Sequence, residues 1–459
     1  MAVDLVIKNC RLVSPDGIAP EGVACDGGRI VVIGSDEYLP EGRKTIDARG
    51  KYLLPGVIDT HVHIGVYHTF KEEMKDTIGA AFGGVTTIGN YLGIGAESQK
   101  ESYELSFDRW KETWERDGLV DGFFHSMIIS EANMKEIRLN AKRYGIASHK
   151  FLMAYKGPEG EQIGAAPADD GLLWFGFKEV ASLGYPGLAQ VHAENIDIIY
   201  RIKPGIQATG RQDLAAWDEA RPGFCETLDA ERAISIARVT GAPLYIVHVS
   251  YADTVDVIAK AKSEGVNVLA ETCPQYLVLS GKPGLGVVAK INPPIRKDVA
   301  SAERLWRGLR EGSIDCMGTD HCSPGAEVKK ELWGASPGTP GVEQFLPLML
   351  SEGVNKGRIT LEKLVEILCQ NNAKAFGMYP KKGAIKVGSD ADMVVVDLEK
   401  RVKLTVNKEH QVCDFIPYEG MEVQGWPVTT ILRGNVLVDD GKLVAKPGIG
   451  KYIPRFVGS

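Results

Sequence analysis

One stretch of the chain decides the fold: Leu53-Leu54-Pro55-Gly56-Val57-Ile58-Asp59-Thr60-His61-Val62-His63. An apolar run that stops at metal-binding side chains is typical of a strand that carries a ligand to one end of a (β/α)8 barrel. Four later apolar runs also stop at a lysine, a histidine or an aspartate. They are Ile146–Lys150, Leu188–His192, Leu244–His248 and Ile314–Asp320. Five such runs in order are hard to explain by core packing, so they predict a metal site at the end of a barrel.

The middle of the chain alternates between strand and helix patterns. Helices are expected over Asn133–Tyr144, Asp229–Val239, Asp253–Ser263 and Ala302–Leu309. Alternation of this kind favours parallel strands with crossover helices. The fold class is therefore predicted to be α/β, with a (β/α)8 TIM barrel over residues 54–379 and with Leu53–Thr60 as its first strand.

Both ends of the chain have the pattern of short strands and turns. Expected strands are Leu5–Asn9, Arg29–Ile33, Met393–Asp397 and Thr429–Leu432. Neither end is long enough to bury a core alone. We expect residues 1–53 and 380–459 to form one small β-sandwich domain, with the barrel inserted between them.

Composition excludes several classes of protein. The chain has 459 residues, of which 44% are hydrophobic and 25% charged, and its net charge is −7. A modest negative charge argues against a nucleic-acid or anionic-membrane partner. No apolar run approaches the length of a membrane span, and the N-terminus lacks the features of a signal peptide. The eight cysteines form no C-x-x-C pair, so we expect reduced thiols and a cytoplasmic protein.

Four histidines are candidate metal ligands. His61 and His63 are one residue apart, and alternate side chains of a strand point the same way, so both imidazoles can reach one ion. His192 and His248 close two further strands. A lone buried histidine is more often a core residue, but successive strand ends favour ligands. Neutral imidazole suits zinc and similar ions.

Asp320 and Lys150 complete the candidate set. The alternative for Asp320 is a helix N-cap; we favour a carboxylate that touches the metal and takes a proton from its bound water. The ammonium of Lys150 cannot bind a cation, but carboxylation by CO₂ would make it an anionic bridge between two ions about 3.5–4 Å apart. A salt-bridged lysine is the alternative. We expect two divalent ions per chain, zinc first, with manganese, cobalt or iron as other choices.

These motifs resemble the amidohydrolase superfamily, and within it the cyclic amidohydrolases: hydantoinase, dihydropyrimidinase, allantoinase and dihydroorotase. The likeness runs from Gly56–His63 through Val191–Asn195 to Gly388–Asp392 and covers nearly the whole chain. The resemblance implies one role for each candidate ligand. His61 and His63 would hold the first metal, His192 and His248 the second, Lys150 would be the bridging carbamate, and Asp320 a first-metal ligand and the general base.

The segment Lys150–Tyr155 resembles the hydantoinase and dihydropyrimidinase pattern, which implies that Tyr155 donates to the developing oxyanion. A core aromatic is the alternative. Asn292 stands where many hydantoinases have serine, at a position whose main chain holds the ring amide. The loop Ser336–Gly341 lacks the asparagine that completes this clamp in hydantoinases. Aromatic residues in two loops could wall a hydrophobic substituent pocket or be mere packing: Tyr67, Phe70 and Tyr91.

The resemblance implies hydrolysis of a small cyclic amide, a 5-substituted hydantoin or a dihydropyrimidine ring. Allantoinase and dihydroorotase are the alternatives. Dihydroorotases carry an arginine two residues after the second histidine, where this chain has Gly65, so a neutral ring is favoured. A non-catalytic dihydropyrimidinase-like binding protein is disfavoured because all six candidate ligands are present. For the assembly we expect a homotetramer or a homodimer.

Overall fold

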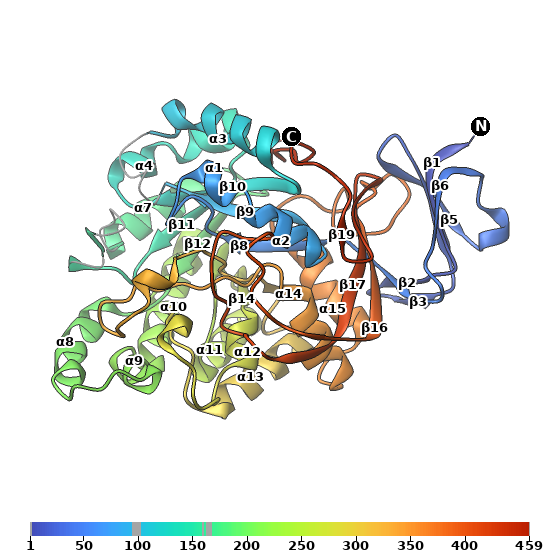
Figure 1. Ribbon diagram of the computed structural model, residues 1–459. Coiled ribbons are helices and arrows are strands. Elements are labelled where there is room, and N and C mark those ends of the chain that lie inside the picture. The colour runs from blue at the N-terminus through green and yellow to red at the C-terminus, as the bar shows by residue number, and fades with distance from the viewer. Residues whose placement is uncertain (1, 94–101, 158–159, 162–167, 459) are drawn as a thin grey trace.

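The barrel is the largest unit of the molecule, seen here in a computed structural model that describes residues 2–93, 102–157, 160–161 and 168–458. Eight parallel strands follow one another in chain order around it (Figure 1). They are β8 (Val57–Val62), β9 (Val85–Leu92), β10 (Asp121–Ile128), β11 (Ser148–Leu152), β12 (Leu188–His192), β13 (Leu244–Ile246), β14 (Val268–Thr272) and β15 (Cys316–Met317). The His63 N–H donates to the His321 carbonyl at 2.8 Å, so the two ends of this sheet meet and the predicted barrel is confirmed.

Helices surround the strands. The longer ones are α3 (Tyr103–Asp117), α7 (Asp170–Ala181), α8 (Ile196–Gln207), α10 (Gly223–Thr240), α11 (Ala252–Ser263) and α13 (Val299–Glu311). Shorter ones are α1 (Phe70–Glu73), α2 (Asp76–Phe82), α4 (Glu131–Lys135), α5 (Ile137–Leu139), η2 (Asn140–Tyr144), α9 (Leu214–Ala220), α12 (Pro274–Val278), α14 (Phe345–Leu348), η5 (Met349–Asn355), α15 (Leu361–Val365), η6 (Glu366–Gln370) and α16 (Asn371–Ala375). Single 3₁₀ turns are η1 (Asp36–Tyr38), η3 (Val287–Ala289) and η4 (Ala326–Val328). The helix expected over residues 133–144 is spread over α4, α5 and η2, and the other three expected helices are present.

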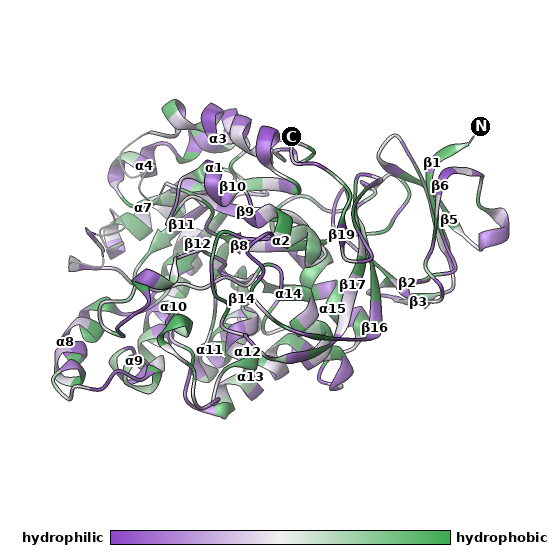
Figure 2. Ribbon diagram, viewed as in Figure 1, coloured by the Kyte–Doolittle hydropathy of each residue, from purple (hydrophilic) through white to green (hydrophobic). Residues whose placement is uncertain are grey.

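The helices are amphipathic, as a layer between core and solvent requires. In α13, for example, Leu305 and Leu309 are buried while Arg307 and Arg310 are exposed. Figure 2 shows hydrophobic and hydrophilic segments alternating along the helices around the barrel. Within the described ranges, no helix has both the length and the apolar composition needed to cross a membrane.

The first apolar run forms two strands, not the single barrel strand that was predicted. β7 (Tyr52–Pro55) pairs with β16 (Met393–Lys403) outside the barrel, and the barrel strand β8 begins only at Val57. The chain crosses between the two at Gly56, where a Cβ would lie 2.2 Å from Thr86 Oγ1. Only glycine fits so close to a neighbouring strand, and this close approach is what the periodicity of the run does not reveal.

The two ends of the chain form the predicted β-sandwich. One sheet has the order β5-β4-β1-β6 and the other the order β19-β18-β17-β16-β7-β2-β3, so the second sheet joins strands from both ends. The remaining strands are β1 (Val3–Lys8), β2 (Arg11–Ser14), β3 (Gly17–Ala19), β4 (Gly22–Asp26), β5 (Arg29–Gly34), β6 (Gly42–Asp47), β17 (Glu422–Leu432), β18 (Asn435–Asp439) and β19 (Lys442–Leu443). Leu5 and Val23 of one sheet share a core with Leu53, Met393 and Ile431 of the other.

The C-terminal part of the chain also leaves the sandwich and contacts the barrel twice. In the connection between β16 and β17, the Val412 N–H donates to Asp76 Oδ1 at 2.8 Å. In the tail, Tyr452 is buried and Arg455 donates to Ser148 Oγ at 2.9 Å, at the start of β11. The domain boundaries at residues 53 and 380 therefore stay a prediction.

A buried charge cluster joins the sandwich to the barrel. Lys382 Nζ lies 2.8 Å from an Asp121 oxygen at the start of β10, 3.3 Å from Asp390 and 2.5 Å from Asp392, next to β16. Arg433 pairs with Asp121 as well. Burial lowers the pKa of Lys382, but the three carboxylates outweigh it and hold that pKa above its usual range. These three acids are thus neutralised by basic side chains of the chain itself.

Replacing Lys382 by methionine should destabilise the protein strongly. The substitution leaves three buried carboxylates without their ammonium partner, and breaking a buried pair costs about 3–5 kcal/mol. The measurement is urea unfolding followed by circular dichroism. Arg138→Ala is the control because it removes an exposed ion pair with Glu179, a kind that adds little stability. Equal midpoints for the two variants would contradict the role given to Lys382.

Candidate metal centre

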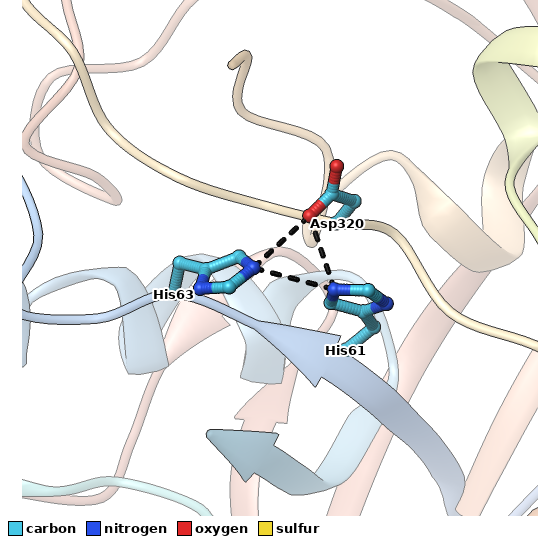
Figure 3. A group of neighbouring side chains, drawn as sticks. All are labelled: His61, His63 and Asp320. Atoms are coloured by element: carbon cyan, nitrogen blue, oxygen red, sulfur yellow. Dashed lines mark hydrogen bonds and ion pairs between the residues drawn. The ribbon is translucent and has the colours of Figure 1, made fainter. Parts of the chain in front are cut away.

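Three side chains meet at the seam of the barrel. His61 lies at the end of β8, His63 follows it, and Asp320 comes from the loop after β15. Asp320 Oδ1 lies 3.2 Å from the Nε2 atoms of both imidazoles, which are themselves 3.3 Å apart. Figure 3 shows the three groups pointing toward one another. One donor atom from each lies within 4.8 Å of the others, close enough to hold one ion.

Lys150 of β11 joins this cluster at the same His61 nitrogen that Asp320 approaches. Its Nζ lies 2.8 Å from His61 Nε2 and 4.2 Å from the centre of the Tyr91 ring. Burial lowers the pKa of Lys150 to about 8, although Asp320 and Glu271 act to raise it. Among the described residues, no carboxylate forms an ion pair with Lys150. A salt-bridged lysine would need such a partner.

His192 and His248 form a second cluster beside the first. His192 Nδ1 and His248 Nε2 are 3.1 Å apart, and the His248 ring centre lies 5.3 Å from that of His61. The side chains come from the end of β12 and from the residue two positions after β13. The structure therefore brings all six predicted ligands to one end of the barrel.

Two buried carboxylates orient these imidazoles from behind. Glu271 Oε1 lies 2.6 Å from His61 Nδ1, and Glu194 Oε2 lies 2.7 Å from His192 Nε2. Arg221 donates twice to Glu194, at 3.0 and 2.8 Å. A carboxylate that accepts from one ring nitrogen leaves the other free for a metal, which is the usual arrangement around metal-binding histidines.

Sequence reasoning missed the role of Glu271. The run Val266–Glu271 is a sixth apolar run that stops at a metal-compatible side chain, so its pattern was available. Its function depends on partners far along the chain: Thr60 and Tyr245 both donate to Oε2, at 2.8 and 2.9 Å. Glu194 lay within a motif singled out above but received no role.

The main chain is strained at two of the candidate ligands. His248 has a φ of +40° and Asp320 a φ of +54°, in the left-handed region that residues other than glycine rarely adopt. Such strain tends to collect at functional sites. Asp59 supports the turn before Asp320, because its carboxylate accepts from the Thr319 N–H at 3.0 Å and the Thr319 hydroxyl at 2.6 Å.

The protonation states of this cluster suit divalent metal ions. Burial is the main cause that lowers the pKa of all four imidazoles, which keeps them neutral. Burial acts to raise the pKa of Asp320, but His61 and His63 outweigh it and hold that pKa well below its usual range. Neutral imidazoles and an ionised carboxylate are the forms in which these groups bind metal.

The residues predicted to bind substrate lie at different depths. Tyr155 is partly exposed, with its ring centre 5.4 Å from that of His192, and burial raises the pKa of its phenol, which therefore stays protonated. Asn292 is buried beside it. Tyr67 is partly exposed and its hydroxyl donates to the Pro337 carbonyl.

Phe70 and Tyr91 are both buried, and neither lies in a loop as expected, because Phe70 begins α1 and Tyr91 lies within β9. Phe70 belongs to the barrel core, and Tyr91 stacks on His63 with ring centres 5.0 Å apart. The Tyr91 hydroxyl accepts from Gln190 Nε2 at 2.8 Å. The substrate-binding roles of all five residues stay predictions.

A barrel whose strand ends bring together four histidines, a lysine and an aspartate is the kind of centre that metal-dependent hydrolases use. The model of the amidohydrolase family matches residues 52–437. The chain belongs to this family.

Full-length relatives support the same assignment. An L-hydantoinase of Paenarthrobacter aurescens is 36% identical over 465 residues, covering 98% of each chain. A D-hydantoinase of Geobacillus stearothermophilus is 36% identical over 467 residues, covering 98% of this chain and 96% of its own. The solved structure of L-hydantoinase (dihydropyrimidinase) from Arthrobacter aurescens has a TM-score of 0.91 at 36% identity, with 99% of this chain and 100% of that chain covered.

Glu271→Gln should weaken metal binding. Loss of the charge weakens the acceptor that fixes the His61 ring, and such substitutions typically cost about 10–100-fold in metal affinity. Zinc affinity is measured on metal-free protein with a competing chromophoric chelator. Glu343→Gln is the matched control, because Glu343 also contacts an imidazole, that of His410 at 2.8 Å, outside this centre. A Glu271 variant with unchanged zinc affinity would rule out the role.

Proposed function

We propose that this protein hydrolyses the amide bond of a five- or six-membered cyclic imide or ureide, a hydantoin or a dihydropyrimidine. The observation that carries the proposal is the convergence of six candidate ligands, from five strand ends, around His61 and His248. The full-length relatives described above are hydantoinases, and the similar solved structure is that of an L-hydantoinase also called a dihydropyrimidinase.

The proposed cofactor is a pair of divalent ions, zinc first. His61, His63 and Asp320 would hold one ion and His192 and His248 the other, with Lys150 between them as an N6-carboxylated lysine. Bound there, the ions supply Lewis acidity for the attacking water and for the scissile carbonyl. The neutral imidazoles support this assignment, as does the absence of an ion-pair partner for Lys150 in the described part of the chain.

The remaining chemistry belongs to two side chains. Asp320 is ionised, so it can take a proton from the attacking water and deliver it to the leaving ring nitrogen. Tyr155 keeps its phenolic proton and can donate to the oxyanion that develops on the carbonyl oxygen. Asn292 is proposed to hold the ring amide through its main chain.

The substrate ring is proposed to carry no carboxylate. Dihydroorotases bind the carboxylate of their substrate with an arginine, and this chain has Gly65 at that position. Gly65 stands at that position with a φ of +94°, and a Cβ there would lie 2.8 Å from Phe70 Cδ2. This backbone leaves no room for an arginine side chain. A substrate carboxylate without a cationic partner would cost several kcal/mol to desolvate. The site therefore favours hydantoinase or dihydropyrimidinase activity over dihydroorotase activity, with allantoinase as the other alternative.

Metal-loaded protein should hydrolyse 5-substituted hydantoins or dihydrouracil with a much higher kcat/KM than dihydroorotate. The reason is the missing cation at Gly65. A panel of these rings and allantoin, measured on one preparation, tests the proposal. A preference for dihydroorotate or allantoin would mean that the proposed substrate class is wrong. If protein that holds two ions hydrolyses none of the rings, a non-catalytic binding protein would be favoured.

Lys150→Ala should lose bound metal and nearly all turnover, because the bridging group is gone. Short-chain carboxylic acids should restore part of the activity by supplying a bridge. Metal content by plasma emission spectrometry is the direct measurement, with the buried Lys329→Ala as the control that keeps its ions. Two ions per chain in the Lys150 variant would show that the lysine has another role.

A homotetramer or homodimer and a cytoplasmic location also stay predictions.

A further inference from the structure

A buried carboxylate holds the loop that follows the first two histidines. Glu73, the last residue of α1, is fully buried. Its oxygens accept from the N–H groups of Gly65 at 2.5 Å, Tyr67 at 3.1 Å and His68 at 2.7 Å. Three main-chain N–H groups that converge on one carboxylate form an anion-binding nest, and here the chain supplies the anion itself.

Loop and carboxylate depend on each other. Burial, followed by the neighbouring Asp76, raises the pKa of Glu73 to about 7. Within the described ranges no basic side chain forms an ion pair with Glu73, so the three N–H groups are the contacts that oppose this rise and favour the ionised carboxylate. In return, Glu73 holds the turn in which Gly65 adopts its left-handed conformation.

The loop carries Tyr67 across the barrel seam. The Tyr67 hydroxyl donates to the Pro337 carbonyl, and the next residue, Gly338, donates through its N–H to the Lys290 carbonyl at 3.0 Å. The loops after β8, β14 and β15 are thereby linked at the ligand end of the barrel. Burial raises the pKa of Tyr67, with smaller contributions from Cys322, Tyr155 and Asp320.

We propose that Glu73 is an internal counter-ion that fixes the loop Ile64–Thr69, and that through Tyr67 it sets the specificity for the substituent on the substrate ring. Glu73 is a positioning residue, since in the described part of the chain the hydrogen bonds of its side chain go to the loop. The inference about substrate specificity rests on the proposed function. The inference that Glu73 occupies the nest of N–H groups does not depend on it. An emptied nest would accept a small carboxylate from solution.

The first test needs no substrate. In Glu73→Ala, amide hydrogen exchange in peptides covering residues 64–69 should become about 10–100-fold faster, the range implied by hydrogen bonds to a charged group. Formate should restore protection, and neutral formamide should not. Glu72→Ala is the matched control, because Glu72 is the exposed neighbour on α1 and, in the described part of the chain, its side chain bonds only to Thr69 at the far end of the loop. In this control, exchange should change at Thr69 alone and stay normal over residues 64–68.

A second variant covers the case in which Glu73→Ala does not fold. Glu73→Gln keeps the shape but not the charge, so its loop should exchange faster than wild type and should not respond to formate, because the nest stays filled. Normal amide exchange in this variant, or an equal response to formate in the Glu72 control, would overturn the proposed counter-ion role of Glu73.

The last test addresses specificity. The ratio of kcat/KM for a hydantoin with a bulky 5-substituent to that for unsubstituted hydantoin should shift about tenfold in Glu73→Ala and in Tyr67→Phe, but not in Glu72→Ala, the size expected for loss of one well-placed contact. An unchanged ratio alongside faster loop exchange would overturn the specificity role alone. If wild-type protein hydrolyses neither ring while formate still protects the loop of Glu73→Ala, the proposed function fails. The counter-ion role of Glu73 is then still supported.

Discussion

Closure of the barrel between its first and last strands holds the candidate metal centre together. The His63 N–H and the His321 carbonyl meet at this seam, 2.8 Å apart, with one ligand-bearing segment on each side. Asp59 reinforces the seam by binding both the N–H and the hydroxyl of Thr319. Because His61 and Asp320 lie on opposite sides of the seam, a small slip of one strand would separate the donor atoms that now lie 3.2 Å apart.

The candidate metal centre also buries several ionisable side chains close together. Four imidazoles, an amine and several carboxylates share a volume from which water is largely excluded, and an unpaired ion there is costly. The structure answers with a layered arrangement. Glu271 and Glu194 support the imidazoles from below, and Arg221 neutralises Glu194. The face of the imidazoles opposite these carboxylates is where the proposed metal ions would add the positive charge that balances Glu271 and Asp320.

Sequence periodicity predicted the parts of the molecule that depend on local pattern. The barrel, the sandwich and the convergence of the strand ends follow from apolar runs and from the residue at which each run stops. The break of the first run at Gly56 was not predicted, because it depends on the distance to Thr86 on another strand. The part played by Glu271 could not be assigned for a similar reason, and that of Glu73 because its nearby partners are main-chain N–H groups, which leave no side-chain pattern in the sequence. A carboxylate has no visible task until the fold shows which N–H groups surround it.

The segment between β16 and β17 ties the two ends of the chain to the chemistry between them. Asp76 accepts the Val412 N–H with one oxygen and contacts His321, next to Asp320, with the other. β7, just before the first ligand strand, pairs with β16 from near the other end. When a ribosome has added residue 320, every candidate ligand and its supports Glu194 and Glu271 are made, but Val412 and the strand β16 that pairs with β7 are not yet synthesised. The centre is therefore completed late in translation, after almost the whole polypeptide has emerged.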